Sequence, residues 1–198
     1  MTWDELIGNG APRNAQQPEA YRDVLYDTQT YTDNATTELT FFAAVNADKT
    51  LSNMPASGSL PAATAFAINA ISTEWLIPFG AGTAAGPVGV ADISLLGIVG
   101  RPILTLTMSD KQYGPWPQQY AGAAGNPTFF GFGTTTSDAG AIAGAQNSFN
   151  GGFFLGNTII LLPNVGFQVN VRWAAAQNIS GNQLLRVSLH GTRYRRVV

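Results

Sequence analysis

The sequence predicts an all-β protein, an antiparallel β-sandwich preceded by an extended N-terminal arm. From Thr37 onward, short runs of β-branched and aromatic residues are separated by clusters of Gly, Pro, Asn and Ser, the pattern of strands joined by turns. No segment keeps apolar residues at helical spacing over three turns. The 198 residues fit one domain with an arm. About six to eight strands in two sheets favour a single jelly roll ahead of an immunoglobulin-like topology.

Residues 1–36 are expected to form the arm. They include Pro12, Pro18 and the polar stretch Asn14–Gln17, and too few regularly spaced apolar positions to bury a face of their own. The apolar residues are separated by polar ones, as in a segment that becomes ordered by lying across another surface. Four aromatic residues of the arm are expected to contact an adjacent subunit: Trp3, Tyr21, Tyr26 and Tyr31.

Residues 37–198 are expected to form the body. Strands are predicted at Thr37–Val45, at Ala65–Phe79 and at Pro102–Met108, where Leu and Met alternate with Thr. Leu51–Thr64 reads as a loop. The region from about 109 to 152 is rich in Gly and aromatics and is longer than ordinary loops, with a candidate strand at "TFFGFG".

The long loop region carries a group of aromatic residues beside Pro115 and Pro117. They are expected either to anchor contacts between subunits or to form a small core beneath the loop. The group consists of Tyr113, Trp116 and Tyr120.

The last third has the clearest strand pattern. "NTIILLPNVGFQVNVRWAA" places an apolar run, a turn and a strictly alternating strand in succession, and "QLLRVSLHGTRYRRV" repeats the alternation. A slip of one residue would bury Arg172, so the register is well specified. The residues expected to face the core are Phe167, Val169, Val171 and Trp173, then Leu185, Val187 and Leu189.

Charge is scarce. Charged residues make up 11% of the chain, against roughly 25% in average soluble domains, which favours a surface covered by neighbouring molecules. Residues 1–99 hold ten acids and three bases, and residues 100–198 hold two acids and seven bases. Folding either mixes the two halves in space or leaves complementary edges on neighbouring copies.

The chemistry of an enzyme is not evident, and we expect a protein without catalytic residues, metal or cofactor. Cysteine is absent, and the one histidine, His190, lies on an outward position among arginines that disfavour its charged form. The flanking "VSLHG" is not a nucleophile elbow. Gly80–Gly86 lacks the spacing of a dinucleotide-binding loop, and no metal-binding spacing is present.

The C-terminal arginines suit nucleic-acid binding in type but not in number, so nucleic acid is not expected as a main partner. We expect them to pair with carboxylates of the acidic N-terminal segment, in the same or a neighbouring copy. As candidate subunit contacts the cluster contributes Arg193, Arg195 and Arg196.

Membrane insertion and export are not expected. Met1–Leu25 holds four acids and no apolar run, which is the wrong pattern for a leader peptide. No window approaches about 18 uninterrupted apolar residues.

Four segments together, "LYDTQTYTDNATTELTFFAA", "SGSLPAATAFAI", "IILLPNVGFQVNVRW" and "LLRVSLHGTRYRRVV", resemble the small β-sandwich structural proteins of bacterial viruses. Such proteins have an arm, an Asp-Thr-x-x-Tyr/Phe stretch, and a jelly-roll-like body ending in an apolar strand with Gly-x-x-Tyr-Arg. The long helix of the tailed-phage major capsid fold has no counterpart here.

The resemblance implies a virion protein that forms, decorates or cements an icosahedral capsid and is assembled in the host cytoplasm. Its partners would be identical subunits and other virion proteins. The alternative is a receptor- or carbohydrate-binding module of a phage spike or fibre that uses Trp75, Trp116 and Tyr120 as stacking platforms.

Overall fold

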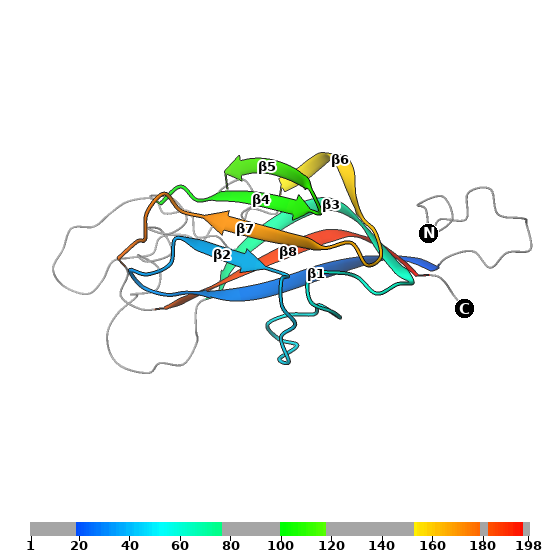
Figure 1. Ribbon diagram of the computed structural model, residues 1–198, viewed down its shortest axis with the longest axis horizontal. Coiled ribbons are helices and arrows are strands. Elements are labelled where there is room, and N and C mark those ends of the chain that lie inside the picture. Colours follow the sequence, from blue (N-terminus) through cyan, green and yellow to red (C-terminus); the bar gives the residue numbers. More distant parts are fainter. Residues whose placement is uncertain (1–18, 77–99, 118–152, 179–181, 196–198) are drawn as a thin grey trace, which may run out of the picture.

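The computed structural model describes residues 19–76, 100–117, 153–178 and 182–195. Every regular element within these ranges is a β-strand, and the strands form two four-stranded antiparallel sheets (Figure 1). The all-β sandwich predicted from the sequence is confirmed. The strands are β1 (Glu19–Tyr31), β2 (Glu38–Phe41), β3 (Thr64–Leu76), β4 (Ile103–Met108), β5 (Lys111–Pro117), β6 (Phe153–Leu161), β7 (Phe167–Arg172) and β8 (Gln183–Arg195).

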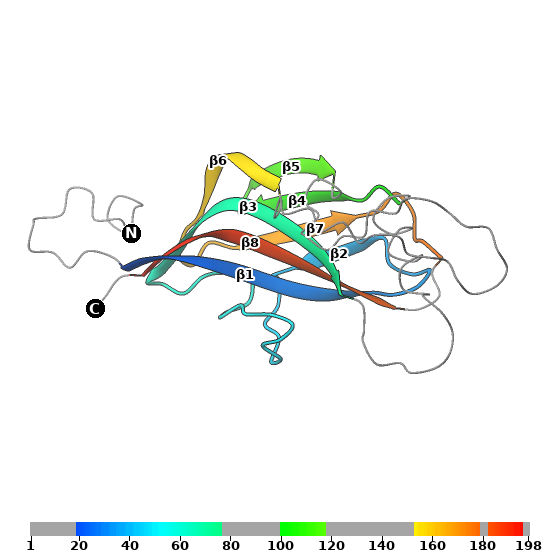
Figure 2. The ribbon, with the colours of Figure 1, turned by 180° about the vertical axis from the view of Figure 1, so that it is seen from behind.

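The strands pair in a regular order. The first sheet has the order β1-β8-β3-β6 and the second has the order β2-β7-β4-β5; Figure 1 views the second sheet in front, and Figure 2 views the first. Strands that are mirror images in chain position are neighbours: β1 with β8, β2 with β7, β3 with β6, and β4 with β5. Successive pairs alternate between the sheets, so the chain resembles one long antiparallel ribbon folded across both.

The core lies between the two sheets. Trp173, which directly follows β7, packs edge-to-face on Tyr31 with 5.0 Å between ring centroids, and its ring lies 6.4 Å from that of Trp75. Full burial of a large apolar side chain contributes about 1.5–3 kcal/mol. All the residues that the sequence directed inward in the last third are buried: Phe167, Val169, Val171, Trp173, Leu185, Val187 and Leu189.

Strand β1 corrects the expected boundary of the arm. Glu19–Tyr31, which the sequence assigned to the arm, pairs with β8 along 13 residues and is an integral strand of the first sheet. Its core-facing side carries Leu25 and Tyr31 but also a buried carboxylate, Asp27. The polar residue interrupts the apolar alternation that identifies a strand in a sequence. Residues 1–18 lie outside the described residues, so an arm there stays a prediction.

The loop between β2 and β3 lies against β1 and covers the middle of its outer edge, at Val24 and Tyr26. The Asn53 side chain accepts a hydrogen bond from the Tyr26 N–H at 2.8 Å and donates one to the Val24 carbonyl at 2.7 Å. The Asn53 N–H donates to the Tyr26 carbonyl at 3.2 Å. One residue therefore occupies backbone groups that would otherwise accept another strand.

Strand β5 lies within the region that the sequence treated as a long loop. It pairs with β4 and forms an edge of the second sheet. Pro115 and Pro117 lack backbone N–H groups, and such residues are confined to edge strands; the Gly114–Pro115 peptide bond is cis. The rest of this region up to residue 152, including "TFFGFG", lies outside the described residues, as does Gly80–Gly86.

Candidate functional site

The predicted contact residues of β1 and β8 fall into two groups. Tyr21 is 40% exposed, and Arg195, opposite Glu19, is also exposed. Arg193 instead pairs with Asp23, with 2.6 Å between Nε and Oδ2. This ion pair joins the acidic and basic halves of the chain within one molecule, as expected if folding brings the two halves together in space. Trp3, Tyr120 and Arg196 lie outside the described residues.

Two tyrosines expected to contact another subunit are engaged within their own chain. Tyr31 is fully buried, and its hydroxyl accepts a hydrogen bond from the Gln177 N–H at 2.7 Å. Tyr26 lies beneath the Arg186 guanidinium, 4.9 Å from the ring centroid, and donates a hydrogen bond to the Lys49 carbonyl at 2.6 Å. The expectation is therefore wrong for Tyr31, and the β2–β3 loop is the partner of Tyr26.

His190 lies on the outer face of the first sheet. Its Nε2 is 2.7 Å from the Ser72 hydroxyl oxygen, and Ser72 is only 4% exposed. Burial lowers the pKa of His190 below its ordinary value of 6.5, the direction that the sequence predicted, although the cause is burial rather than arginine charge. The contact ties β3 to β8, and neither residue lines the two hollows described below.

The lowered pKa of His190 predicts a pH-dependent stability. The unfolded chain takes up a proton near pH 6.5, whereas the folded chain takes it up only at lower pH, so the unfolded state binds more protons in between. This contribution to the free energy of unfolding should be constant above that window and should fall as the pH decreases through it. Urea denaturation across the window should show a smaller loss in His190→Gln than in the wild-type chain. If the free energy of unfolding fell equally with pH in both chains, His190 would not be the source of the pH dependence.

An apolar groove opens between the β4–β5 hairpin and β6, which lie beside each other in Figures 1 and 2. It encloses about 450 Å³. The half-buried side chains of Tyr113 and Trp116 pack on the main core, so the structure joins them to that core rather than to a separate one. The other lining residues, which no pattern in the sequence marks as a site, are Met108, Leu155, Gly156, Asn157, Thr158, Ile159 and Ile160.

The β6 edge beside this groove differs from the edge opposite it. Where Asn53 occupies the β1 edge, the β6 sequence "FFLGNTIIL" carries neither proline nor charge. A shift in pairing between Ile68 and Ala70 of β3 interrupts the ladder, and the exposed Gly156, Asn157 and Thr158 fall in this interruption. Within the described residues, no side-chain contact like that of Asn53 covers the outer edge of β6, although the interrupted pairing makes this edge irregular, which itself disfavours strand addition.

The stacking platform expected for a carbohydrate module is not assembled as predicted. Trp75 is only 6% exposed and packs on Trp173 in the core. A ring in that position cannot stack on a ligand, so the prediction that Trp75 binds a carbohydrate is wrong. Trp116 remains at the groove.

Among the described residues, no three His, Asp or Glu side chains gather in a group suited to a metal ion. No helix in the same ranges has the length and apolar character needed to cross a membrane. No protein-family model, curated protein or solved structure matches the chain.

Proposed function

We propose that the chain is a non-enzymatic structural protein of a virion, which forms or decorates an icosahedral capsid through contacts with identical copies and other virion proteins. The observation that carries the proposal is the strand order. Mirror-image pairing that alternates between two four-stranded sheets supports an eight-stranded jelly roll, an architecture used by viral capsid subunits. Since one fold serves many functions, the surface must supply further support.

The surface chemistry supports contact between identical copies. With charged residues at 11% of the chain, burying surface against a neighbour removes few ions from water, and ion desolvation is the costly part of such burial. The groove supplies Trp116, Tyr113 and Met108, residue types that are enriched in protein interfaces. We assign this groove, with the adjoining edge of β6, as the contact with a second copy.

A charge placed in the groove should disrupt assembly without unfolding the chain. Asn157 is exposed and lines the groove, so Asn157→Lys should leave the core intact and put an ammonium group into the apolar contact. We expect the concentration of half-assembly to rise at least about tenfold, equivalent to about 1.4 kcal/mol. Size-exclusion chromatography with light scattering over a concentration series of the full chain would measure it.

Thr30→Lys is the matched control, because Thr30 is exposed on β1 at the opposite edge of the first sheet. It should assemble as the wild type does. A wild-type chain that stays monomeric throughout the series, or equal loss in both variants, would refute the groove contact. Quantitative mass spectrometry of purified virus particles tests the virion role separately: an amount stoichiometric with the shell supports it, and absence from the particles refutes it.

A further inference from the structure

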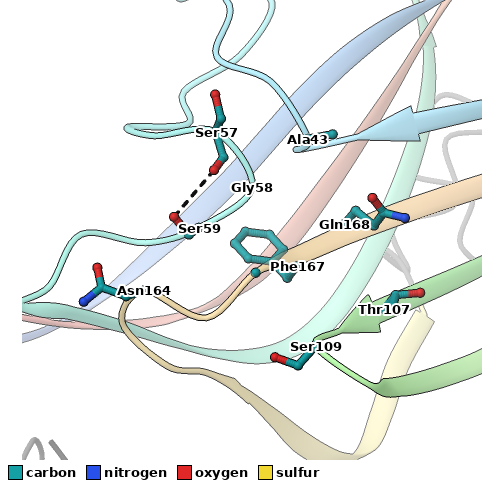
Figure 3. A pocket seen from close by; sticks show the side chains of 10 residues that line it. Ala43, Ser57, Gly58, Ser59, Thr107, Ser109, Asn164, Phe167 and Gln168 are labelled. Carbon is teal, nitrogen blue, oxygen red and sulfur yellow. Dashed lines mark hydrogen bonds between the residues drawn. The ribbon is translucent and has the colours of Figure 1, made fainter.

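A second hollow lies at one end of the second sheet, and it shares no lining residue with the apolar groove. It is open to solvent and has a volume of about 580 Å³, within the range of small-molecule sites. Figure 3 shows its side chains arranged around Phe167, which is only 3% exposed and therefore lies beneath the hollow without offering a stacking surface. The lining residues are Ala43, Ser57, Gly58, Ser59, Thr107, Ser109, Asn164, Gly166, Phe167 and Gln168.

Backbone hydrogen bonds hold the walls of this polar pocket together. The Gly58 carbonyl accepts a hydrogen bond from the Phe167 N–H at 2.7 Å, and the Gly166 carbonyl accepts one from the Ser109 N–H at 2.9 Å. The Asn164 N–H donates to the carbonyl of Leu60 at 3.0 Å. Three connections, β2–β3, β4–β5 and β6–β7, are thereby tied to one another, and the pocket exists before any ligand arrives.

Left-handed backbone conformations gather at the same place. Gly58, Ser109 and Asn164 have φ values of 61°, 49° and 58°. Gly58 adopts this conformation freely because it has no Cβ, whereas Ser109 and Asn164 are non-glycine residues in a less common conformation, of the kind found in tight turns and at ligand sites. Each of the three connections contributes one of them to the pocket wall.

The chemistry of the lining selects an uncharged ligand with many hydroxyl groups. Six side chains are hydroxyls or amides and none of the ten lining residues is charged. An ionic ligand would lose hydration here without gaining an opposite charge. Hydroxyls and amides both donate and accept, as the hydroxyls of a sugar ring do.

Four of these polar side chains are available to a ligand. Thr107 and Gln168 lie opposite each other on β4 and β7, and Ser109 and Asn164 project from the adjoining turns. No hydrogen bond to another described residue involves these side chains. We propose that this pocket binds a neutral saccharide of one or two rings, an activity beyond the assembly role and independent of it.

Saturation-transfer NMR on the full chain tests the proposal with cellobiose, lactose and N,N′-diacetylchitobiose as probes and 3′-sialyllactose as the acidic comparison. At least one neutral sugar should bind with a Kd below about 10 mM. Thr107→Val and Gln168→Leu should each weaken it about tenfold or more, because polar groups of the sugar lose their partners. Thermal melting of each variant verifies folding.

Thr105→Val is the matched control, since Thr105 is two residues away on β4, opposite Asn170 rather than at the pocket. It should bind the sugar as the wild type does. Three results would each overturn the proposal: no transfer to any neutral sugar, equal weakening by Thr105→Val and Thr107→Val, or binding of 3′-sialyllactose alone. None of them bears on assembly through the groove, whose variants lie elsewhere.

Discussion

Gly191→Ala should destabilise the chain by about 3 kcal/mol or more, lowering Tm by about 6–12 °C. Gly191 lies in β8 opposite Ile68 of β3. An added Cβ would collide with the Ala67 carbonyl oxygen and would lie 2.8 Å from Cε1 of Phe66. Ala67 cannot move aside easily, because β3 pairs with β8 on one side and β6 on the other. Differential scanning calorimetry would measure the loss.

Gly166→Ala provides the matched control for this substitution. A Cβ at Gly166 meets no atom within 4 Å, so the same chemical change should alter the free energy of unfolding by at most about 0.5–1 kcal/mol, in the stabilising direction if the backbone tolerates it. Equal melting temperatures for the two variants would show that β3 and β8 can move apart at Gly191 at little cost in free energy.

Asp27→Ala should lower the free energy of unfolding by about 2–4 kcal/mol. Oδ2 of Asp27 accepts hydrogen bonds from the Phe42 N–H at 2.7 Å and from Nε2 of Gln29 at 3.0 Å. Phe42 is fully buried and has a φ of 68°, so its N–H would be left in the core without an acceptor. Urea denaturation measures the global effect, and hydrogen exchange at the Phe42 amide measures the local one.

Asp27→Asn keeps the size of the side chain and one acceptor oxygen while replacing the carboxyl group with an amide. An amide oxygen can still accept from the Phe42 N–H, so this variant should retain slow exchange at that amide and lose about half as much stability. If Asp27→Ala proved as stable as Asp27→Asn, the carboxylate would not be what holds the chain in its left-handed turn after β2.

The strands that alternate strictly were predictable from the sequence, and those with polar inward positions were not. Val169 and Val187 reach the core as expected, since one-residue slips in those strands would bury charge or polar groups. The assignment failed at β1, where Asp27 faces the core; its acceptor role depends on the N–H of Phe42, 15 residues away. Sequence spacing carries no information on such a pairing.

The two hollows differ in how far the sequence anticipated them. The aromatic residues Tyr113 and Trp116, beside prolines, predict a contact, but the sequence does not show that Leu155 of β6, far along the chain, lines the same groove. The polar pocket was not anticipated at all. Its six polar residues are Ser, Thr, Asn and Gln from three connections and two strands, and they meet only through long-range contacts such as the Thr107–Gln168 pairing and the hydrogen bond from the Phe167 N–H to the Gly58 carbonyl.

The Asn53 contacts on the outer edge of β1 limit the number of copies of the chain that can join by pairing their edge strands. A sheet that grows without limit by strand addition needs an accepting edge at both ends of every subunit. The two edge strands of the first sheet are β1 and β6. Among the described residues, Asn53 hydrogen-bonds to the outer backbone groups of β1. Pairing of two copies through β6 would leave only β1 edges at its ends, and there the Asn53 side chain already occupies backbone groups of Val24 and Tyr26. Within the described residues, Asn53 therefore favours a closed pair of copies over a sheet that grows without limit.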